Sequence, residues 1–247
     1  MRIAVAGGTG VVGRHVVRAV RDAGHEPVVL ARAHGVDLVT TEGLARALTG
    51  VDAVVDVANI TTLSRRRATR FFGAVSSNLA RLGRDAGVRH VVTLSIVGVD
   101  RVGLGYYQAK LLQEKVALGG PVGATVQRAT QFHEFVDQTL ARVPGPLALL
   151  PRMRTLPVAA ADVAARLVTL AAGEPQGMVE DLAGPEVHEL VDLARAVSAA
   201  RGLRRPVVPV RVAGATGRAL ATGGLLPTRP GPRGSLGFTE WLAAQTG

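Results

Sequence analysis

Short apolar runs alternate with segments of helical periodicity from the start of the chain to about residue 140. Residues 2–6 are mostly apolar, which indicates a short buried strand. Residues 11–23 then place Val12, Val16 and Val20 on one face of a helix, and Gly24 ends this helix. Further strands are predicted at residues 25–31, 53–58, 89–95 and 124–129, and further helices at residues 43–48, 69–86 and 106–118.

The alternation of strands with helices predicts the fold class. Successive strand–helix–strand units favour an α/β fold, with a doubly wound parallel sheet of the Rossmann type covered on both faces. Beyond this region the pattern is weaker, and the Gly-, Pro- and Arg-rich residues 201–236 predict loop with one short helix at most. No linker is evident, so we expect residues 1–247 to form one domain with a small C-terminal lid from about residue 150. The remaining predicted elements are helices at residues 162–172, 189–200 and 238–244 and a strand at residues 178–182.

A glycine-rich turn follows the first predicted strand and precedes the first predicted helix. Gly8-x-Gly10-x-x-Gly13 matches the dinucleotide fingerprint. Gly7-x-x-Gly10-x-x-Gly13 is a second, overlapping glycine spacing. The early glycines permit a tight turn close to a pyrophosphate, the last one lets the helix pack on the sheet, and the helix N-terminus attracts the phosphates. The residues predicted to bind a dinucleotide here are Gly7, Gly8, Thr9, Gly10, Val11, Val12 and Gly13.

The end of the second predicted strand indicates which dinucleotide binds. A site for NAD(H) usually has an acidic residue there, ~20 residues after the glycines, to bind the ribose hydroxyls. This chain has Arg32 instead, and a guanidinium can pair with the 2′-phosphate of NADP(H). We therefore expect NADP(H) rather than NAD(H), although Arg32 is alternatively an ordinary surface arginine. The loop residues Asp37 and Leu38, and Ala58 and Asn59 at the end of the third strand, are further expected cofactor contacts.

Three polar side chains near the fourth predicted strand suggest a catalytic set. Ser95 ends that strand, and Tyr106 and Lys110 are spaced i, i+4 on one face of the following helix, a register that Tyr107 lacks. A carbonyl reduced by hydride needs a proton donor, and a free tyrosine has a pKa of ~10. A nearby ammonium stabilises the phenolate and lowers that pKa, while a serine hydroxyl orients the carbonyl. Lys110 is also expected to hold the nicotinamide ribose.

These motifs resemble those of the short-chain dehydrogenase/reductase superfamily. The resemblance is carried by Gly-Gly-Thr-Gly-Val-Val-Gly at residues 7–13, by Ser95 and by Tyr-x-x-x-Lys at residues 106–110. Leu-Ser-Ile-Val-Gly at residues 94–98 and Ala-Gly-Pro-Glu at residues 183–186 are similar to segments of its atypical branch, close to NAD(P)H-binding NmrA-like proteins. The likeness extends over about the first 200 residues.

The resemblance implies that Ser95, Tyr106 and Lys110 form a Ser-Tyr-Lys catalytic set of an oxidoreductase. Some members of the NmrA-like branch have lost the tyrosine and act as cofactor sensors, so a non-catalytic NADP(H)-sensing regulator is one alternative. An epimerase or dehydratase with the same fold, which retains its cofactor, is another. Since all three groups are present here, we expect an NADPH-dependent reductase acting on a ketone, aldehyde or quinone-like carbonyl.

Composition narrows the possible partners. The formal charge is +10, but only Lys110 and Lys115 of the 29 basic residues are lysines, and the other 27 are arginines scattered along the chain. Aromatic residues make up 3% of the chain, which leaves few stacking platforms for single strands, so we expect no nucleic-acid partner. The absence of cysteine excludes disulfides and thiolate sites, and no His/Asp/Glu spacing suggests a metal. No signal peptide or membrane span is evident, so a cytoplasmic protein is expected, with a homodimer as one possible assembly.

Candidate substrate contacts lie beyond two of the strands. His133 follows the fifth strand, where it either binds substrate or caps a local turn, and Phe132 either lines the same pocket or packs a helix on the sheet. Thr61 follows the third strand and is expected near the nicotinamide. Leu, Val, Met and Pro predominate over charged residues in the C-terminal lid, which favours a mainly apolar small-molecule substrate.

Overall fold

A six-stranded sheet forms the centre of the N-terminal part of the chain. The computed structural model describes residues 1–246, and the strands of this sheet follow the order β2-β1-β3-β4-β5-β8. The pairs β1–β2, β1–β3, β3–β4 and β5–β8 are parallel, as the alternating sequence pattern predicts. The strands are β1 (Arg2–Ala6), β2 (Glu26–Leu30), β3 (Ala53–Asp56), β4 (His90–Ile96), β5 (Gly123–Ala129) and β8 (Gly177–Met178).

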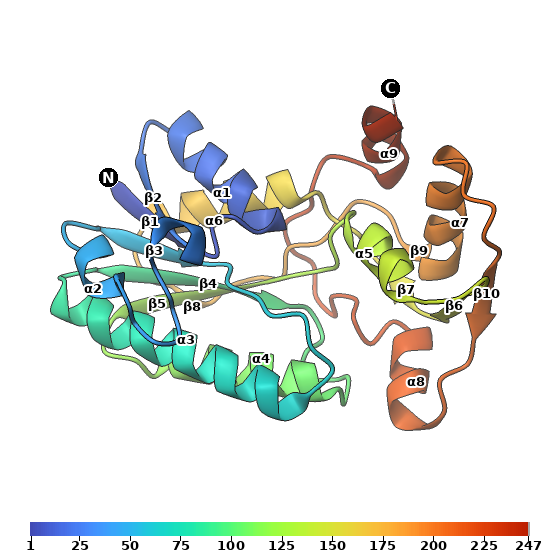
Figure 1. The fold of residues 1–247 in the computed structure, drawn as a ribbon, viewed down its shortest axis with the longest axis horizontal. Coiled ribbons are helices and arrows are strands. Elements are labelled where there is room, and N and C mark those ends of the chain that lie inside the picture. The colour runs from blue at the N-terminus through green and yellow to red at the C-terminus, as the bar shows by residue number, and fades with distance from the viewer. Residues whose placement is uncertain (247) are drawn as a thin grey trace. The chain divides into compact units, whose positions relative to one another are not determined.

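Helices cover both faces of this sheet. Figure 1 shows α1 (Val11–Asp22) and α6 (Ala160–Ala172) above the sheet, and α3 (Arg65–Asp85) and α4 (Gly105–Leu118) below it. The short helix α2 (Leu44–Ala47) precedes β3. Apolar side chains of the sheet and of α3 form a core in which Val54, Val75 and Leu79 are fully buried. The predicted Rossmann-type α/β fold is therefore confirmed.

The chain divides into two compact units. The first comprises Met1–Ser95, Gly105–Arg128 and Val163–Glu180, and so contains the sheet and its helices. The second comprises Ile96–Leu104, Ala129–Asp162 and the chain from Asp181 onward. The single domain with a C-terminal lid stays a prediction. The elements of the second unit are α5 (Phe135–Arg142), β6 (Ala148–Pro151), β7 (Arg154–Thr155), β9 (His188–Glu189), α7 (Leu190–Ala200), β10 (Val207–Val210), α8 (Gly214–Ala221) and α9 (Phe238–Thr246).

The second unit departs most from the sequence expectations. The region predicted as loop, residues 201–236, contains α8 and also β10, which pairs in parallel with β6. Helix α5 and strand β6 were not predicted, although Val136 and Leu140 are spaced i, i+4 on the buried face of α5. The strand expected at residues 178–182 is the two-residue β8 of the first unit. Strands this short are defined by their pairing partners, so a local pattern has little chance of finding them.

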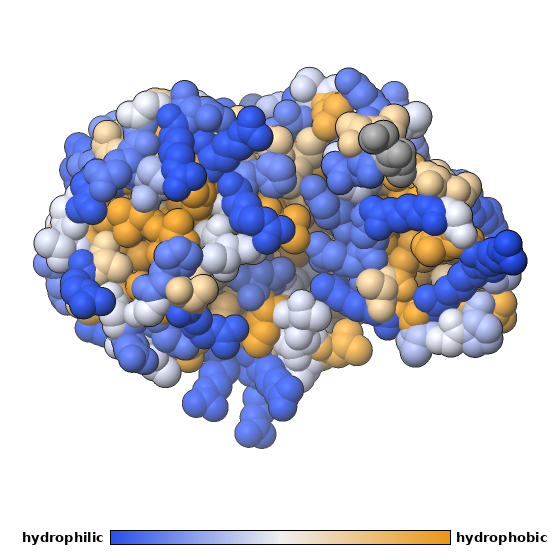
Figure 2. Space-filling model, turned by 45° about the horizontal axis from the view of Figure 1, so that its top comes forward, coloured by the Kyte–Doolittle hydropathy of each residue, from blue (hydrophilic) through white to orange (hydrophobic). Residues whose placement is uncertain are grey.

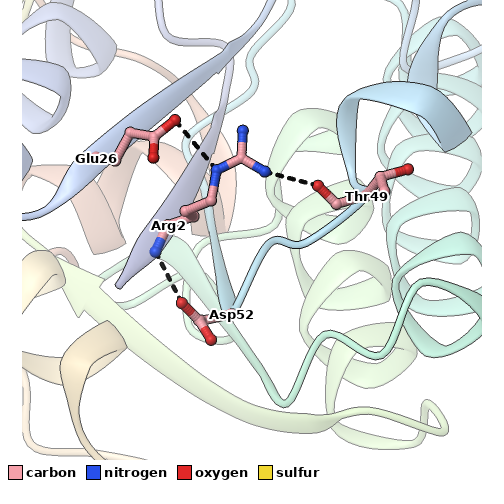
Figure 3. A network of polar contacts seen from close by, with 4 residues as sticks. All are labelled: Arg2, Glu26, Thr49 and Asp52. Carbon is pink, nitrogen blue, oxygen red and sulfur yellow. Dashed lines mark hydrogen bonds and ion pairs between the residues drawn. The ribbon is translucent and has the colours of Figure 1, made fainter.

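Arg2 ties together the amino-terminal ends of three strands (Figure 3). Its backbone N–H donates to the Asp52 carboxylate at 2.7 Å, its Nε to Glu26 at 3.1 Å and its Nη1 to the Thr49 carbonyl at 2.8 Å. Asp52 precedes β3 and Glu26 begins β2. This network stabilises the edge of the sheet at the amino-terminal ends of the strands. Ligands of this fold bind at the opposite edge, outside the carboxyl ends of the strands.

Polar side chains and separate apolar areas share the face seen in Figure 2. Figure 2 shows hydrophilic side chains spread over the viewed face, interrupted by smaller hydrophobic areas. Among the described residues, no helix is long and apolar enough to cross a bilayer. Nor do residues 1–246 contain a group of three or more His, Asp or Glu side chains that could hold a metal ion.

Candidate active site

The glycine turn lies where the strand order reverses. β1 is flanked by β2 on one side and β3 on the other, and the crevice outside such a switch point binds ligands. Gly7 has φ of +80°, and a Cβ there would lie 2.8 Å from the Cα of Ala58. A Cβ on Gly13 would lie 2.1 Å from the Gly7 carbonyl oxygen. Only glycine fits at these two positions, so the turn holds the start of α1 directly against the ends of β1 and β3.

The N-terminus of α1 is suited to an anion. Gly10 begins the helix without a side-chain cap, and the first turn contains no acidic residue. The N–H groups of a first helical turn have no partner within the helix, and they carry the positive end of the helix dipole. Arg14 adds a cation, and its guanidinium donates to the Thr9 carbonyl at 3.0 Å. A pyrophosphate fits this cradle, since it would take the place of the missing cap.

The loop after β2 contains the residues expected to select the dinucleotide. Arg32 is exposed and begins a 3-10 turn, Arg32–His34. The Asp37 carboxylate accepts hydrogen bonds from the N–H groups of Val39 (2.7 Å) and Thr40 (2.9 Å). These bonds lower the pKa of Asp37, and the charge of Arg32 lowers it further. Both side chains are thus charged and close enough to interact at the end of β2.

The other residues predicted to contact the cofactor, in the loops after β2 and β3, have different surroundings. Leu38 packs against the core, and its carbonyl accepts a hydrogen bond from Asn78 at 2.9 Å. Ala58 is buried beside the glycine turn and donates its N–H to Asp56 at 3.1 Å. Asn59 is exposed, and its side-chain oxygen accepts a hydrogen bond from the Tyr106 hydroxyl at 2.6 Å. This last contact joins the end of β3 to the start of α4.

Tyr106 and Lys110 lie on the same side of α4 and share one aromatic neighbour. The Tyr106 ring meets Phe72 of α3 edge to face, with centroids 5.6 Å apart. The Lys110 ammonium lies 4.8 Å from the centroid of the same ring and donates to the Leu94 carbonyl at 2.7 Å. The next residue of β4 is Ser95, whose buried hydroxyl has no hydrogen-bond partner among the described residues. The fold therefore brings the helix pair and the strand end into one region.

The two tyrosines of this helix and Lys110 differ in their surroundings. Burial raises the pKa of Tyr107 to about 12, so its phenol is a poor proton donor near neutrality. Tyr106 is half-buried and bonded to the Asn59 amide oxygen. Burial lowers the pKa of Lys110 to about 8, and the charges of Asp56 and Glu114 oppose this effect. Tyr106 is thus the better placed of the two tyrosines for proton transfer.

Several buried polar residues near Lys110 were not predicted from the sequence. Asp56 and Gln113 are connected to it by hydrogen bonds, and Glu114 pairs with Arg128 of β5 through two bonds of 2.8 Å. The available signal was the spacing of Lys110, Gln113 and Glu114 on one helix, which places polar groups on a face that must pack. A polar face of that kind indicates buried partners that only the fold can supply.

The predicted substrate contacts lie in different surroundings. Thr61 is exposed in the loop after β3. His133 is fully buried in the second unit, where it clusters with the rings of Phe238 and Trp241, and its Nε2 is 3.1 Å from the Leu236 carbonyl. Burial lowers the pKa of His133, which favours the neutral ring. Phe132 is half-buried and forms an isolated bridge with Val158. Their roles toward a substrate stay predictions.

A family model matches the N-terminal part of the chain. Residues 3–99 match the model of the NAD dependent epimerase/dehydratase family. A curated relative, the ceramide reductase of Caulobacter vibrioides, is 27% identical over 203 residues, which cover 72% of this chain and 63% of that protein. The chain thus matches less than two thirds of that relative's length. The finer placement in the NmrA-like branch stays a prediction.

Solved structures match the whole chain at low sequence identity. A short-chain dehydrogenase/reductase superfamily protein from Agrobacterium tumefaciens with bound NAD has a TM-score of 0.72 at 19% identity, over 100% of this chain and 96% of that one. The Citrobacter sp. triphenylmethane reductase complexed with NADP(H) has a TM-score of 0.69 at 16% identity, over 100% of both chains. These likenesses concern the fold. The family model covers residues 3–99, and membership of the whole chain in the short-chain dehydrogenase/reductase superfamily stays a prediction from its motifs.

Proposed function

We propose that this protein is an NADPH-dependent reductase that converts a ketone, aldehyde or quinone-like carbonyl of a mainly apolar small molecule to the alcohol. The observation that carries the proposal is that Tyr106 and Lys110 both contact the ring of Phe72. In addition, the Tyr106 hydroxyl donates a hydrogen bond to Asn59, which follows Ala58 beside the glycine turn. The Caulobacter relative, named a ceramide reductase, supports a reduction over other reactions of the superfamily.

Tyr106 is the proposed proton donor. Its hydroxyl donates to the Asn59 amide oxygen, and a substrate carbonyl oxygen is an acceptor of the same kind. A substrate that takes over this hydrogen bond would place its carbonyl oxygen within proton-transfer distance of the phenol. NADPH, when bound, supplies the hydride that adds to the carbonyl carbon, and the Tyr106 proton goes to the carbonyl oxygen.

Lys110 is the proposed electrostatic partner of Tyr106. Once the proton has left, the phenolate carries a negative charge that a nearby cation stabilises. The Lys110 ammonium, held over the ring that Tyr106 also contacts, stabilises that charge. Since the stabilisation exists only after charge develops, it lowers the barrier rather than tightening substrate binding.

Ser95 is the proposed orienting group. Its hydroxyl is buried and has no partner within residues 1–246, and such an unsatisfied group costs about 1–3 kcal/mol. A carbonyl oxygen that accepts this hydrogen bond would remove that cost. The buried, unpaired hydroxyl at the end of β4 thus fits a polar group of a ligand.

Arg32 is the proposed determinant of NADP(H) preference. No acidic residue ends β2, and Arg32 is exposed there, free of the core. The Asp37 carboxylate, on which the Arg32 charge acts, already accepts hydrogen bonds from the backbone of Val39 and Thr40. A guanidinium beside a 2′-phosphate forms charge-assisted hydrogen bonds that a ribose hydroxyl matches only weakly.

A turnover assay tests this function. The purified chain is mixed with NADPH and a panel of apolar ketones, aldehydes and quinones, and the loss of NADPH is followed together with the alcohol product. We expect stoichiometric NADPH consumption with at least one carbonyl class. Cofactor binding without turnover for every class, in protein shown to be folded, would contradict a reductase and favour a cofactor-sensing regulator.

A second candidate is an epimerase or dehydratase. The family model over residues 3–99 carries that description, and such enzymes keep their dinucleotide through the reaction. In that case a substrate would isomerise or lose water with no net change in NADPH. Product analysis by mass spectrometry beside the absorbance assay separates the two candidates.

A further inference from the structure

A chain of buried hydrogen bonds runs from the end of β3 through α4 to β4. Gln113 donates its amide N–H to the Asp56 carboxylate at 2.8 Å, and its amide oxygen accepts from the Lys110 ammonium. Lys110 also donates to the Leu94 carbonyl of β4. Gln113 is fully buried and Asp56 is 1% exposed, so the bridge is shielded from bulk solvent.

Gln113 is well suited to connect opposite charges. Its oxygen faces an ammonium, which only donates, and its nitrogen faces a carboxylate, which only accepts. The reverse orientation would place donor against donor and acceptor against acceptor. The amide is therefore held in one orientation, and each charge polarises it in favour of the other.

Lys110 needs a nearby negative charge to remain an ammonium. The residue is 6% exposed, and burial of this kind disfavours the charged form. Two acidic side chains oppose that effect: Asp56 of β3 and Glu114 of α4. Glu114 is already neutralised by two hydrogen bonds from Arg128 of β5. Burial raises the pKa of Asp56, and the Lys110 charge opposes this together with hydrogen bonds from the Ala58 N–H and the Gln113 amide. Lys110 is therefore the cation against which the Asp56 carboxylate is held.

We propose that Asp56 and Gln113 are positioning residues, which hold Lys110 in its place over Phe72 and in its charged form. Asp56 supplies the negative charge, and Gln113 transmits it while fixing the ammonium position between α4 and β4. The consequence for the reaction rests on the proposed function, in which the Lys110 charge stabilises the Tyr106 phenolate. The electrostatic connection itself is a property of the folded chain.

The surroundings of Asp56 provide a structural control. Asp56 lines a small cavity with Ser76 and Thr93, whose buried hydroxyls have no hydrogen-bond partner among the described residues. Ser76 contacts neither Lys110 nor Gln113 through any of the bonds above. Ser76→Ala therefore perturbs the same part of the core without touching the bridge.

The experiment uses the fact that the chain has two lysines. Selective isotope labelling of lysine gives two Cε NMR signals, from buried Lys110 and exposed Lys115, and the second is an internal reference. The titration midpoint of each is measured in the full-length protein and in Asp56→Asn, Gln113→Met and Ser76→Ala. Thermal unfolding of each variant establishes that it is folded. Asp56→Asn keeps the shape of the side chain, and Gln113→Met is an independent variant should the first fail to fold.

We expect the Lys110 midpoint to fall by about one pH unit or more in Asp56→Asn and in Gln113→Met. It should stay in place in Ser76→Ala, and Lys115 should not move in any variant. In the double variant Asp56→Asn/Gln113→Glu the carboxylate is relocated next to Lys110, and the midpoint should return to its original value or above. Loss of packing alone would not produce that rescue.

An unchanged Lys110 midpoint in folded Asp56→Asn and Gln113→Met would overturn the proposal, as would a failure of the charge relocation to restore it. These readouts need no turnover, so they are independent of the proposed reaction. If the midpoints move as expected but Tyr106→Phe leaves all activity intact, the positioning pair stands and the proposed function fails. If turnover is observed, its alkaline limit should move to lower pH in Asp56→Asn, together with the lysine midpoint.

Discussion

The Tyr106 hydroxyl donates a 2.6 Å hydrogen bond to the side-chain oxygen of Asn59 and so connects the start of α4 to the end of β3. Residue 59 follows directly on Ala58, whose Cα lies against Gly7 of the dinucleotide turn. The phenol is therefore held next to the carboxyl edge of the sheet, where this fold binds its cofactor. This relationship determines the first prediction.

Tyr106→Phe is expected to lower kcat by about a hundredfold or more, since the proton donor is lost and general acid catalysis contributes that much. Dinucleotide affinity should stay within a factor of about two, because the glycine turn is untouched. Steady-state kinetics and cofactor titration measure the two effects. Tyr107→Phe on the same helix is the matched control and should retain activity. Equal activity of the two variants would refute the role of Tyr106.

The buried lysine predicts a pH dependence. The pKa of Lys110 is about 8 in the folded chain, below the ordinary lysine value of 10.5, because burial disfavours the ammonium. The ammonium stabilises the phenolate, so the active form carries the proton and is lost as the pH rises. Turnover should therefore decrease through about pH 8. A kcat profile with no decline on the alkaline side of that value would argue against a charged Lys110 in the reaction.

Gly13→Ala is expected to weaken dinucleotide binding by about tenfold or more and to destabilise the fold by about 1–3 kcal/mol. The new Cβ would lie 2.1 Å from the Gly7 carbonyl oxygen, so α1 has to move away from the turn. Cofactor titration and chemical denaturation give both numbers. Gly73→Ala in the middle of α3 meets only the Leu112 side chain, at 3.6 Å, and should leave binding unchanged. Similar losses in both variants would mean that the glycine turn has no special role.

Arg32→Ala is expected to reduce NADPH affinity by about 10- to 100-fold and to leave NADH affinity nearly unchanged. The exposed guanidinium at the end of β2 is the proposed partner of the 2′-phosphate, which NADH lacks. Isothermal titration with each cofactor measures the difference. Arg46→Ala removes an exposed arginine from α2 and serves as the charge control. Tight NADH binding in the parent, unaffected by either substitution, would contradict the NADP(H) preference.

The buried ion pair between Glu114 and Arg128 predicts a stability effect. Its side chains are 6% and 16% exposed, and Glu114→Gln would remove the carboxylate charge from this pair. Loss of one partner of a buried pair costs about 3–5 kcal/mol, and partial exposure of Arg128 places this one at the lower end. Urea denaturation measures it. Asp85→Asn removes the exposed ion pair with Arg84 and should change the free energy of unfolding little. Equal losses of stability in the two variants would show that burial does not determine the contribution of the Glu114–Arg128 pair.

The sequence alone determined the features that depend on neighbours along the chain. Val12, Val16 and Val20 mark the buried face of α1 because helical periodicity is local, and all three are buried in the structure. The glycines at positions 7 and 13 were predicted because a turn between strand and helix constrains adjacent residues. The same holds for the shared face of Tyr106 and Lys110, which the i, i+4 spacing specifies before any packing occurs.

Only the tertiary structure decided what surrounds these residues. Asp56 and Gln113 are 57 residues apart, and they meet because the fold packs α4 beside α3 on the face of the sheet that contains β3. The Tyr106 contact with Asn59 spans 47 residues for the same reason. Short strands such as β10 exist through pairing with β6 and carry no periodicity of their own. The pKa of Lys110 likewise depends on burial and on charges from other elements, which no local pattern contains.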